Sequence, residues 1–89
     1  MKVESRTFAR FWKYYDQLPE DIRRQADKQY ALFVKEPFHP SLRLKPVGPF
    51  WSVRISLAYR ALALRRGEVF AWFWIGHHDE YEEILKNAE

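Results

Sequence analysis

The stretch WFWIGHHDEYEEIL, residues 72–85, passes from an apolar run directly into two histidines and then into an acidic segment that carries one tyrosine. A short apolar run without alternation is typical of a strand that is buried on both faces of a sheet. The segment after it has the composition of a solvated helix, in which Asp79 can act as N-cap and Glu82 completes a capping box. The stretch therefore predicts a central strand, a short helix, and a junction that carries His78 and Tyr81.

Two further segments, residues 42–47 and 51–57, alternate apolar and polar side chains, and residues 59–66 are also read as a strand. Such alternation indicates strands with one buried and one polar face. Arg66 and Gly67 are expected to form the turn of a hairpin that leads into the apolar strand. These segments predict a small, mainly antiparallel sheet of three to four strands, to which residues 2–5 could add an edge strand.

The N-terminal third has a helical period instead. Large apolar side chains recur there at intervals of three and four positions, as in an amphipathic helix: Phe8, Phe11, Trp12, Tyr15 and Leu18. This stripe predicts a helix over residues 7–17. Pro19, with two acids after it, is a typical helix start, and Pro37 ends the second helix. The predicted fold class is α+β, with a helical hairpin packed on one face of the sheet and a short C-terminal helix.

The chain has 89 residues, including 4 Trp, 5 Tyr and 7 Phe, and it contains no cysteine. A chain of this length builds one small core, so we expect a single domain over residues 1–89. No segment reaches the roughly 18 apolar residues that a membrane span needs, and the N-terminus lacks the apolar run of a secretory signal. We expect a cytoplasmic protein that does not bind a membrane.

Charge is distributed unevenly along the chain. Residues 37–67 contain six basic side chains and no acidic one, whereas the whole chain has a formal net charge of +3. The six are Arg43, Lys45, Arg54, Arg60, Arg65 and Arg66. Because most of them belong to predicted strands, the sheet face opposite the helical hairpin is expected to be positive.

A basic surface with aromatic residues beside it fits nucleic acid, since guanidinium groups bind phosphate oxygens and exposed rings stack on bases. The alternative is that these cations are only the solvated side of a sheet. Arg60 shares a face with Leu62 and Leu64, so it requires either an anionic ligand or an internal salt bridge. Tyr81 could equally be the apolar anchor of its helix.

Other kinds of site find little support in the sequence. It has no glycine-rich phosphate loop, no cysteine pattern for zinc and no spacing typical of a Ser-His-Asp triad. His77 and His78 are neighbours, and neighbours on a strand point to opposite faces, so we expect no metal site between them. No metal or other cofactor is predicted.

The order of these motifs resembles the RelE/ParE superfamily of bacterial toxins. The resemblance rests on residues 18–47, on WSVRISLAYRAL (residues 51–62) and on WFWIGHHDEY (residues 72–81), and it covers nearly the whole chain. It implies the toxin of a type II toxin-antitoxin system, neutralised by a cognate antitoxin protein. In the RelE branch it implies a metal-independent endoribonuclease that cleaves mRNA on the ribosome. In the ParE branch it implies a non-enzymatic inhibitor of DNA gyrase, and a degenerate member would only bind its antitoxin.

Carried over residue by residue, the resemblance implies a catalytic set of four side chains: Arg54, Arg60, His78 and Tyr81. Many members have an arginine at the position of His78. We expect RNA-binding side chains beside this set: Arg43, Lys45 and Arg65. Histidine exchanges protons near neutral pH, so His78 is expected to act as acid or base. The two catalytic arginines would stabilise the charged phosphorane, and the tyrosine would stack on or orient the RNA.

Overall fold

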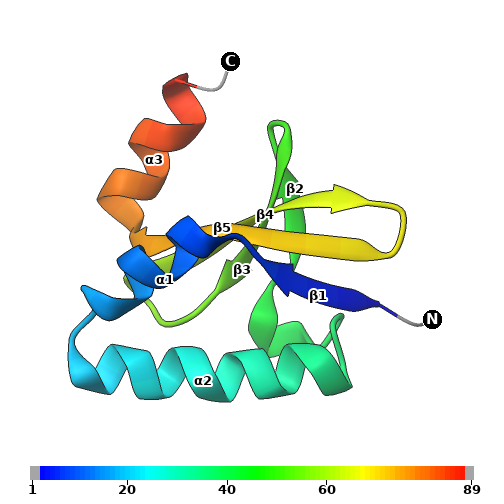
Figure 1. Cartoon of the computed structure of the whole chain (residues 1–89), viewed down its shortest axis with the longest axis horizontal. Coiled ribbons are helices and arrows are strands. Elements are labelled where there is room, and N and C mark those ends of the chain that lie inside the picture. The colour runs from blue at the N-terminus through cyan, green and yellow to red at the C-terminus, as the bar shows by residue number, and fades with distance from the viewer. Residues whose placement is uncertain (1–2, 88–89) are drawn as a thin grey trace.

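The computed structural model describes residues 3–87, which form a five-stranded sheet with three α-helices and a short 3-10 helix (Figure 1). The elements in chain order are β1 (Glu4–Thr7), α1 (Ala9–Asp16), α2 (Glu20–Lys35), η1 (Pro40–Leu42), β2 (Lys45–Val47), β3 (Phe50–Arg54), β4 (Tyr59–Arg66), β5 (Val69–His77) and α3 (His78–Asn87). The α+β class is confirmed. None of the helices in this part of the chain is long and apolar enough to cross a membrane.

The sheet has the strand order β1-β5-β4-β3-β2. Strands β2 to β5 pair antiparallel with their neighbours, and β1 pairs parallel with β5. The four antiparallel strands agree with the upper limit of the prediction, and β1 adds a fifth, parallel strand, so the sheet is mixed rather than three- to four-stranded. The parallel pair arises because α1 and α2, rather than a hairpin turn, follow β1. The expected edge strand over residues 2–5 is found as β1, although residue 2 lies outside the described residues.

The two N-terminal helices differ from the predicted hairpin on one face. Helix α2 runs along one face of the sheet, while α1 packs on β5 (Figure 1). Helix α1 contributes Phe11 to the core beneath α2 and Tyr14 to the packing of the opposite face. A hydrogen bond of 2.6 Å from the Tyr15 hydroxyl to the Asp27 carboxylate joins the two helices. Because Phe11 and Tyr14 reach opposite faces of the sheet, α1 lies across β5 and not side by side with α2.

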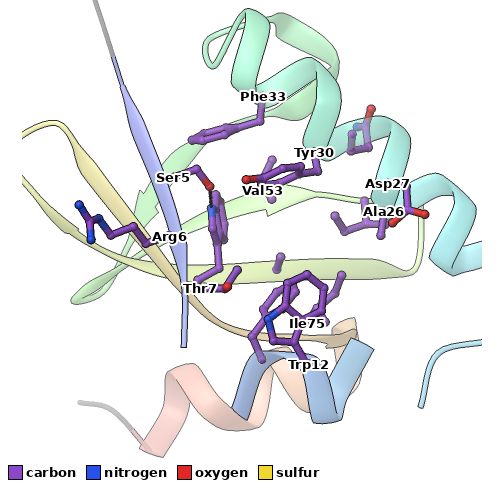
Figure 2. A pocket seen from close by; sticks show the side chains of 15 residues that line it. Ser5, Arg6, Thr7, Trp12, Ala26, Asp27, Tyr30, Phe33, Val53 and Ile75 are labelled. Carbon is purple, nitrogen blue, oxygen red and sulfur yellow. Dashed lines mark hydrogen bonds between the residues drawn. The ribbon is translucent and has the colours of Figure 1, made fainter. Parts of the chain in front are cut away.

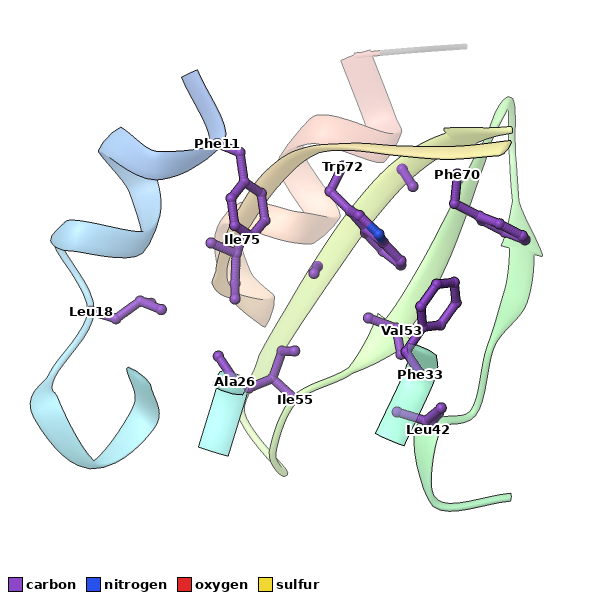
Figure 3. Packing of buried hydrophobic residues seen from close by; sticks show 12 residues of the cluster. Phe11, Leu18, Ala26, Phe33, Leu42, Val53, Ile55, Phe70, Trp72 and Ile75 are labelled. Carbon is purple, nitrogen blue, oxygen red and sulfur yellow. The ribbon is translucent and has the colours of Figure 1, made fainter. Parts of the chain in front are cut away.

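The main core fills the space between α2 and the sheet (Figure 3). Phe33 of α2 meets Phe70 and Trp72 of β5 edge-on, with ring centroids 5.4 and 5.3 Å apart. A smaller cluster lies on the other face, where Leu62, Phe73 and Trp74 are covered by side chains of α3. The two consecutive aromatic residues reach the same cluster because the β4–β5 register shifts between Leu62 and Ala63. This irregularity could not be seen in the apolar run of the sequence.

Strand β2 is shorter than the predicted strand over residues 42–47. It begins at Lys45 because η1 occupies residues 40–42 and Arg43 has the left-handed φ of 49°. The predicted hairpin between β4 and β5 is present, with Gly67 at a φ of 58° in its two-residue connection. A left-handed φ at this position suits glycine, which has no Cβ.

Candidate functional site

Basic side chains gather on the sheet face that points away from α2, here called the basic face. Arg54 of β3 and Arg60 of β4 are direct cross-strand partners. Their neighbours Val53 and Ala61 are buried in the main core, so the alternation of the strands turns both arginines to the other side. Lys45 of β2 pairs with β3 two residues before Arg54 and lies on the same face. The sheet register thus brings three of the predicted cations together.

Arg43 belongs to the same group, although it precedes β2. Burial lowers the pKa of the Arg60 guanidinium, the charges of Arg54 and Arg43 lower it further, and Tyr81 raises it. Of these residues, Arg54 is also the direct cross-strand partner of Arg60. Within residues 3–87 no acidic side chain forms an ion pair with any of the three arginines. Cations that repel one another without a neutralising acid create a positive local potential, which favours the approach of an anion.

The Arg60 guanidinium is oriented by the loop that joins β3 to β4. Its Nη1 donates hydrogen bonds to the carbonyl oxygens of Ser56, Leu57 and Tyr59, at 2.7, 3.2 and 2.9 Å. The internal salt bridge considered for this residue does not form among the described residues. Its Nε and Nη2 have no hydrogen-bond partner in that part of the chain, so they are available to a ligand.

Tyr81 packs against the cluster formed by Leu62, Phe73 and Trp74, as an apolar anchor of α3 would. It also lies close enough to Arg60 to influence its pKa, so the anchoring role and a place at the basic face are compatible. Tyr81 is half-buried. Its ring is therefore fixed at the boundary between the apolar cluster and the cations.

Gly76 shapes the base of this surface and was not singled out by the sequence. It is the cross-strand partner of Arg60, and a Cβ at this position would lie 2.6 Å from Cζ2 of the Trp74 ring. The indole thus occupies the volume that a side chain would need. A glycine between bulky apolar residues and a histidine is the signal in the sequence that could have revealed this close approach.

His78 is the first residue of α3, and its backbone N–H donates to the Ala58 carbonyl oxygen at 2.8 Å. The same loop holds Arg60, so the histidine and the arginine are attached to one segment. The His77 and His78 rings stack with centroids 4.6 Å apart. The expectation that they point to opposite faces is wrong, because β5 ends at His77 and the alternation of a strand stops there.

Asp79 does not act as the expected N-cap, since α3 has already begun at His78. Its backbone N–H instead donates to Nδ1 of His77 at 3.2 Å. Its carboxylate lies 3.5 Å from Nδ1 of both His77 and His78. Sequence reasoning missed this convergence, although the HHD motif itself was its signal.

Arg65 is not part of the basic face. Its partner on β5 is Phe70, a residue of the main core. The guanidinium carbon lies 4.7 Å from the centroid of the Trp51 ring and 4.9 Å from that of Phe70, and Nε donates to the Gly67 carbonyl oxygen at 2.8 Å. The structure therefore places this predicted RNA-binding residue on the α2 side, apart from the other cations.

A cavity of about 370 Å³ lies on the α2 side of the sheet, between α2, α1 and β1 (Figure 2). Its lining is mostly apolar, with Phe33, Trp72 and Ile75 among the residues that form it. Trp12 and Tyr30 also line it and are each 48% exposed. The sequence predicted a helix stripe here, but it could not show that the stripe would be left partly uncovered.

Comparison with known proteins gives matches in structure only. No protein-family model matches the chain, and no curated protein matches it in sequence. The crystal structure of YafQ from E. coli BL21(DE3) has a TM-score of 0.70 at 7% identity, covering 90% of this chain and 98% of that one. A doubly substituted E. coli toxin RelE in the free state has a TM-score of 0.65 at 18% identity and covers 100% of both chains.

The RelB–RelE antitoxin-toxin complex from Methanococcus jannaschii has a TM-score of 0.70 at 13% identity, covering 89% of this chain and 96% of that one. Identities this low establish the fold and not the activity. The overall arrangement of helices and strands is thus one that solved structures share. The chain has the fold of the RelE/ParE superfamily of toxins.

Proposed function

We propose that this protein is the toxin of a type II toxin-antitoxin system and that it cleaves mRNA on the ribosome. The observation that carries the proposal is the uncompensated cluster of Arg43, Arg54 and Arg60 beside Tyr81. Positive charge that lacks an internal partner suits the phosphate backbone of RNA. The fold supports the proposal because several proteins that share it are toxins.

The proposed cleavage is a transesterification. The ribose 2′-hydroxyl loses its proton, its oxygen attacks the adjacent phosphorus, and the bond from phosphorus to the 5′-oxygen breaks as that oxygen gains a proton. The products are a 2′,3′-cyclic phosphate and a free 5′-hydroxyl. His78 serves one of the two proton transfers as acid or base, and water serves the other.

The charged phosphorane requires fixed donors on the basic face. Arg60 has Nε and Nη2 free for its oxygens while Nη1 is held by the loop carbonyls. Arg54, its cross-strand partner, adds a second guanidinium. Donors that are held in place before reaction stabilise developing charge most effectively. Tyr81 stacks on or orients a base, and Arg43 and Lys45 bind the flanking phosphates.

A cognate antitoxin is the proposed protein partner. Trp12 and Tyr30 leave a partly exposed apolar cavity between α1 and α2, and aromatic residues of this kind are typical anchors of protein interfaces. Several structures with this fold are complexes of RelE with the antitoxin RelB. We infer that an apolar segment of the antitoxin occupies the cavity.

Expression in growing bacteria without an antitoxin tests the proposal. The wild-type chain is expected to stop growth and to produce cleaved mRNA, detected as new 5′ ends by primer extension. The double variant Arg60→Ala/His78→Ala is expected to permit growth and leave mRNA intact. Growth arrest with intact mRNA, accompanied by inhibition of gyrase supercoiling by the purified protein, would instead support the ParE-type activity.

A further inference from the structure

Three consecutive side chains converge where β5 meets α3: His77, His78 and Asp79. One donor atom of each lies within 4.8 Å of the other two. Nδ1 of each histidine is 3.5 Å from an oxygen of the carboxylate. A tetrahedral Zn²⁺ with bonds of about 2.0–2.2 Å requires donor atoms about 3.4 Å apart. Each histidine–carboxylate separation is close to this spacing, but His77 is paired with Oδ2 of Asp79 and His78 with Oδ1, so the three side chains have to adjust when one ion is bound through a single carboxylate oxygen.

The backbone holds these side chains in this arrangement. His77 is the last residue of β5 and is paired with Tyr59, whose ring meets the imidazole edge-on at 5.4 Å. The N–H of His78 is bound to the Ala58 carbonyl oxygen at 2.8 Å. The strand-to-helix junction thus places consecutive residues on one side, and the two imidazoles do not have to be brought together when a ligand binds.

The donor atoms are accessible and have few competing partners. The side chains of His77, His78 and Asp79 are 38%, 43% and 77% exposed. No lysine or arginine within residues 3–87 forms an ion pair with Asp79. A metal ion would replace one hydrogen bond, from the Asp79 N–H to His77 Nδ1. Two imidazoles and one carboxylate, with a fourth position open to water, are a ligand set typical of Zn²⁺.

We propose that this junction binds one divalent transition-metal ion of the zinc class through His77, His78 and Asp79. The ion coordinates the His78 imidazole, which the proposed cleavage uses for proton transfer, so metal binding inhibits RNA cleavage. The regulatory consequence rests on the proposed function. The binding of the ion does not, because it follows from the donor geometry alone.

Titration calorimetry of the tag-free, full-length chain with Zn²⁺ tests the binding. The wild type is expected to bind one ion per chain, and His77→Ala and Asp79→Asn are each expected to weaken binding at least about tenfold. His39→Ala is the matched control, because His39 immediately precedes η1 and its Nδ1 is hydrogen-bonded to Ser41. Circular dichroism confirms that each variant is folded. Asp79→Asn is the variant less prone to unfold, because the Asp79 side chain is exposed.

Three results would overturn the site: no Zn²⁺ binding by the wild type, binding that survives both substitutions in folded protein, or a loss in His39→Ala as large as in Asp79→Asn. The regulatory part has its own readout, the ratio of mRNA cleavage with and without Zn²⁺. Zn²⁺ is expected to lower cleavage by the wild type at least about tenfold, so that its ratio is about 0.1 or less. The ratio for Asp79→Asn is expected to stay near one. Metal binding by a protein that never cleaves mRNA would refute the proposed function and leave the metal site intact.

Discussion

Replacement of Arg60 by alanine separates its two roles, holding the β3–β4 loop and facing the RNA. Its Nη1 has two hydrogens for three carbonyl acceptors, so about two full hydrogen bonds are lost. At roughly 1.5 kcal/mol for each bond from a charged donor, the loss is about 3 kcal/mol. The variant also loses the repulsion of Arg60 by Arg54 and Arg43, which raises the unfolding free energy by on the order of 1 kcal/mol. The net loss of unfolding free energy is therefore about 2 kcal/mol, which a domain of ordinary stability tolerates.

The expected effect on activity is larger than the effect on stability. Removal of one preorganised donor from a site of developing charge typically lowers the rate about 10²- to 10³-fold. We expect Arg60→Ala to reduce ribosome-dependent mRNA cleavage by this factor, measured under conditions where urea unfolding shows that the variant is folded. Cleavage by folded Arg60→Ala within roughly twofold of the wild-type rate would refute the assignment, because such a ratio is less than 1 kcal/mol of transition-state stabilisation.

Arg65→Ala is the matched control for this experiment. Arg65 belongs to the same strand as Arg60 but lies over the Trp51 and Phe70 rings on the α2 side of the sheet. Its replacement is expected to lower the unfolding free energy by about 0.5–2 kcal/mol through the lost cation–π contacts. Cleavage is expected to remain near the wild-type rate. A loss of cleavage equal to that of Arg60→Ala would mean that charge in general, and not the basic face, is responsible.

Three further predictions concern the cavity, the helix contact and the floor of the basic face. Trp12→Ala is expected to weaken antitoxin binding by about 2 kcal/mol or more, measured by calorimetry, and an unchanged affinity would exclude the cavity as the docking site. The hydrogen bond to Asp27 raises the pKa of the Tyr15 hydroxyl above its ordinary value of 10.0. The stability that this hydrogen bond contributes is therefore complete below pH 10, and it is lost as the pH rises through the higher pKa of the folded state. Urea unfolding should therefore show a smaller alkaline loss for Tyr15→Phe than for the wild type, and equal losses would contradict this. Gly76→Ala is expected to lower the unfolding free energy by about 1–3 kcal/mol, because the new Cβ would meet the Trp74 ring at 2.6 Å. A melting temperature equal to that of the wild type would contradict this close approach.

The parts of the fold that the sequence predicted well are those with strong local signals. Strand β4 matches the predicted segment over residues 59–66, and α2 lies between the two predicted proline boundaries. The parallel β1 was poorly specified because four residues carry little periodicity and their partner is more than sixty residues away. The path of α1 across two faces depends on tertiary packing, which an amphipathic stripe does not encode.

The candidate site was predictable to the extent that it depends on strand alternation. Arg54 and Arg60 fall on the basic face because their neighbours are apolar and buried. Arg65 was assigned to this surface although it lies five positions from Arg60 on the same strand, so alternation turns its side chain to the opposite face, over the Trp51 and Phe70 rings. The convergence of His77 with Asp79 was missed because a rule for strands was applied at the residue where the strand ends.

Cleavage of a defined mRNA on purified ribosomes is the decisive test of whether the basic face cuts RNA. We expect the isolated wild-type chain to cut ribosome-bound mRNA, and we expect Arg54→Ala to reduce this cutting about 10²- to 10³-fold while the protein remains folded. Intact mRNA after incubation with folded wild-type protein, or equal cutting by Arg54→Ala, would contradict this expectation.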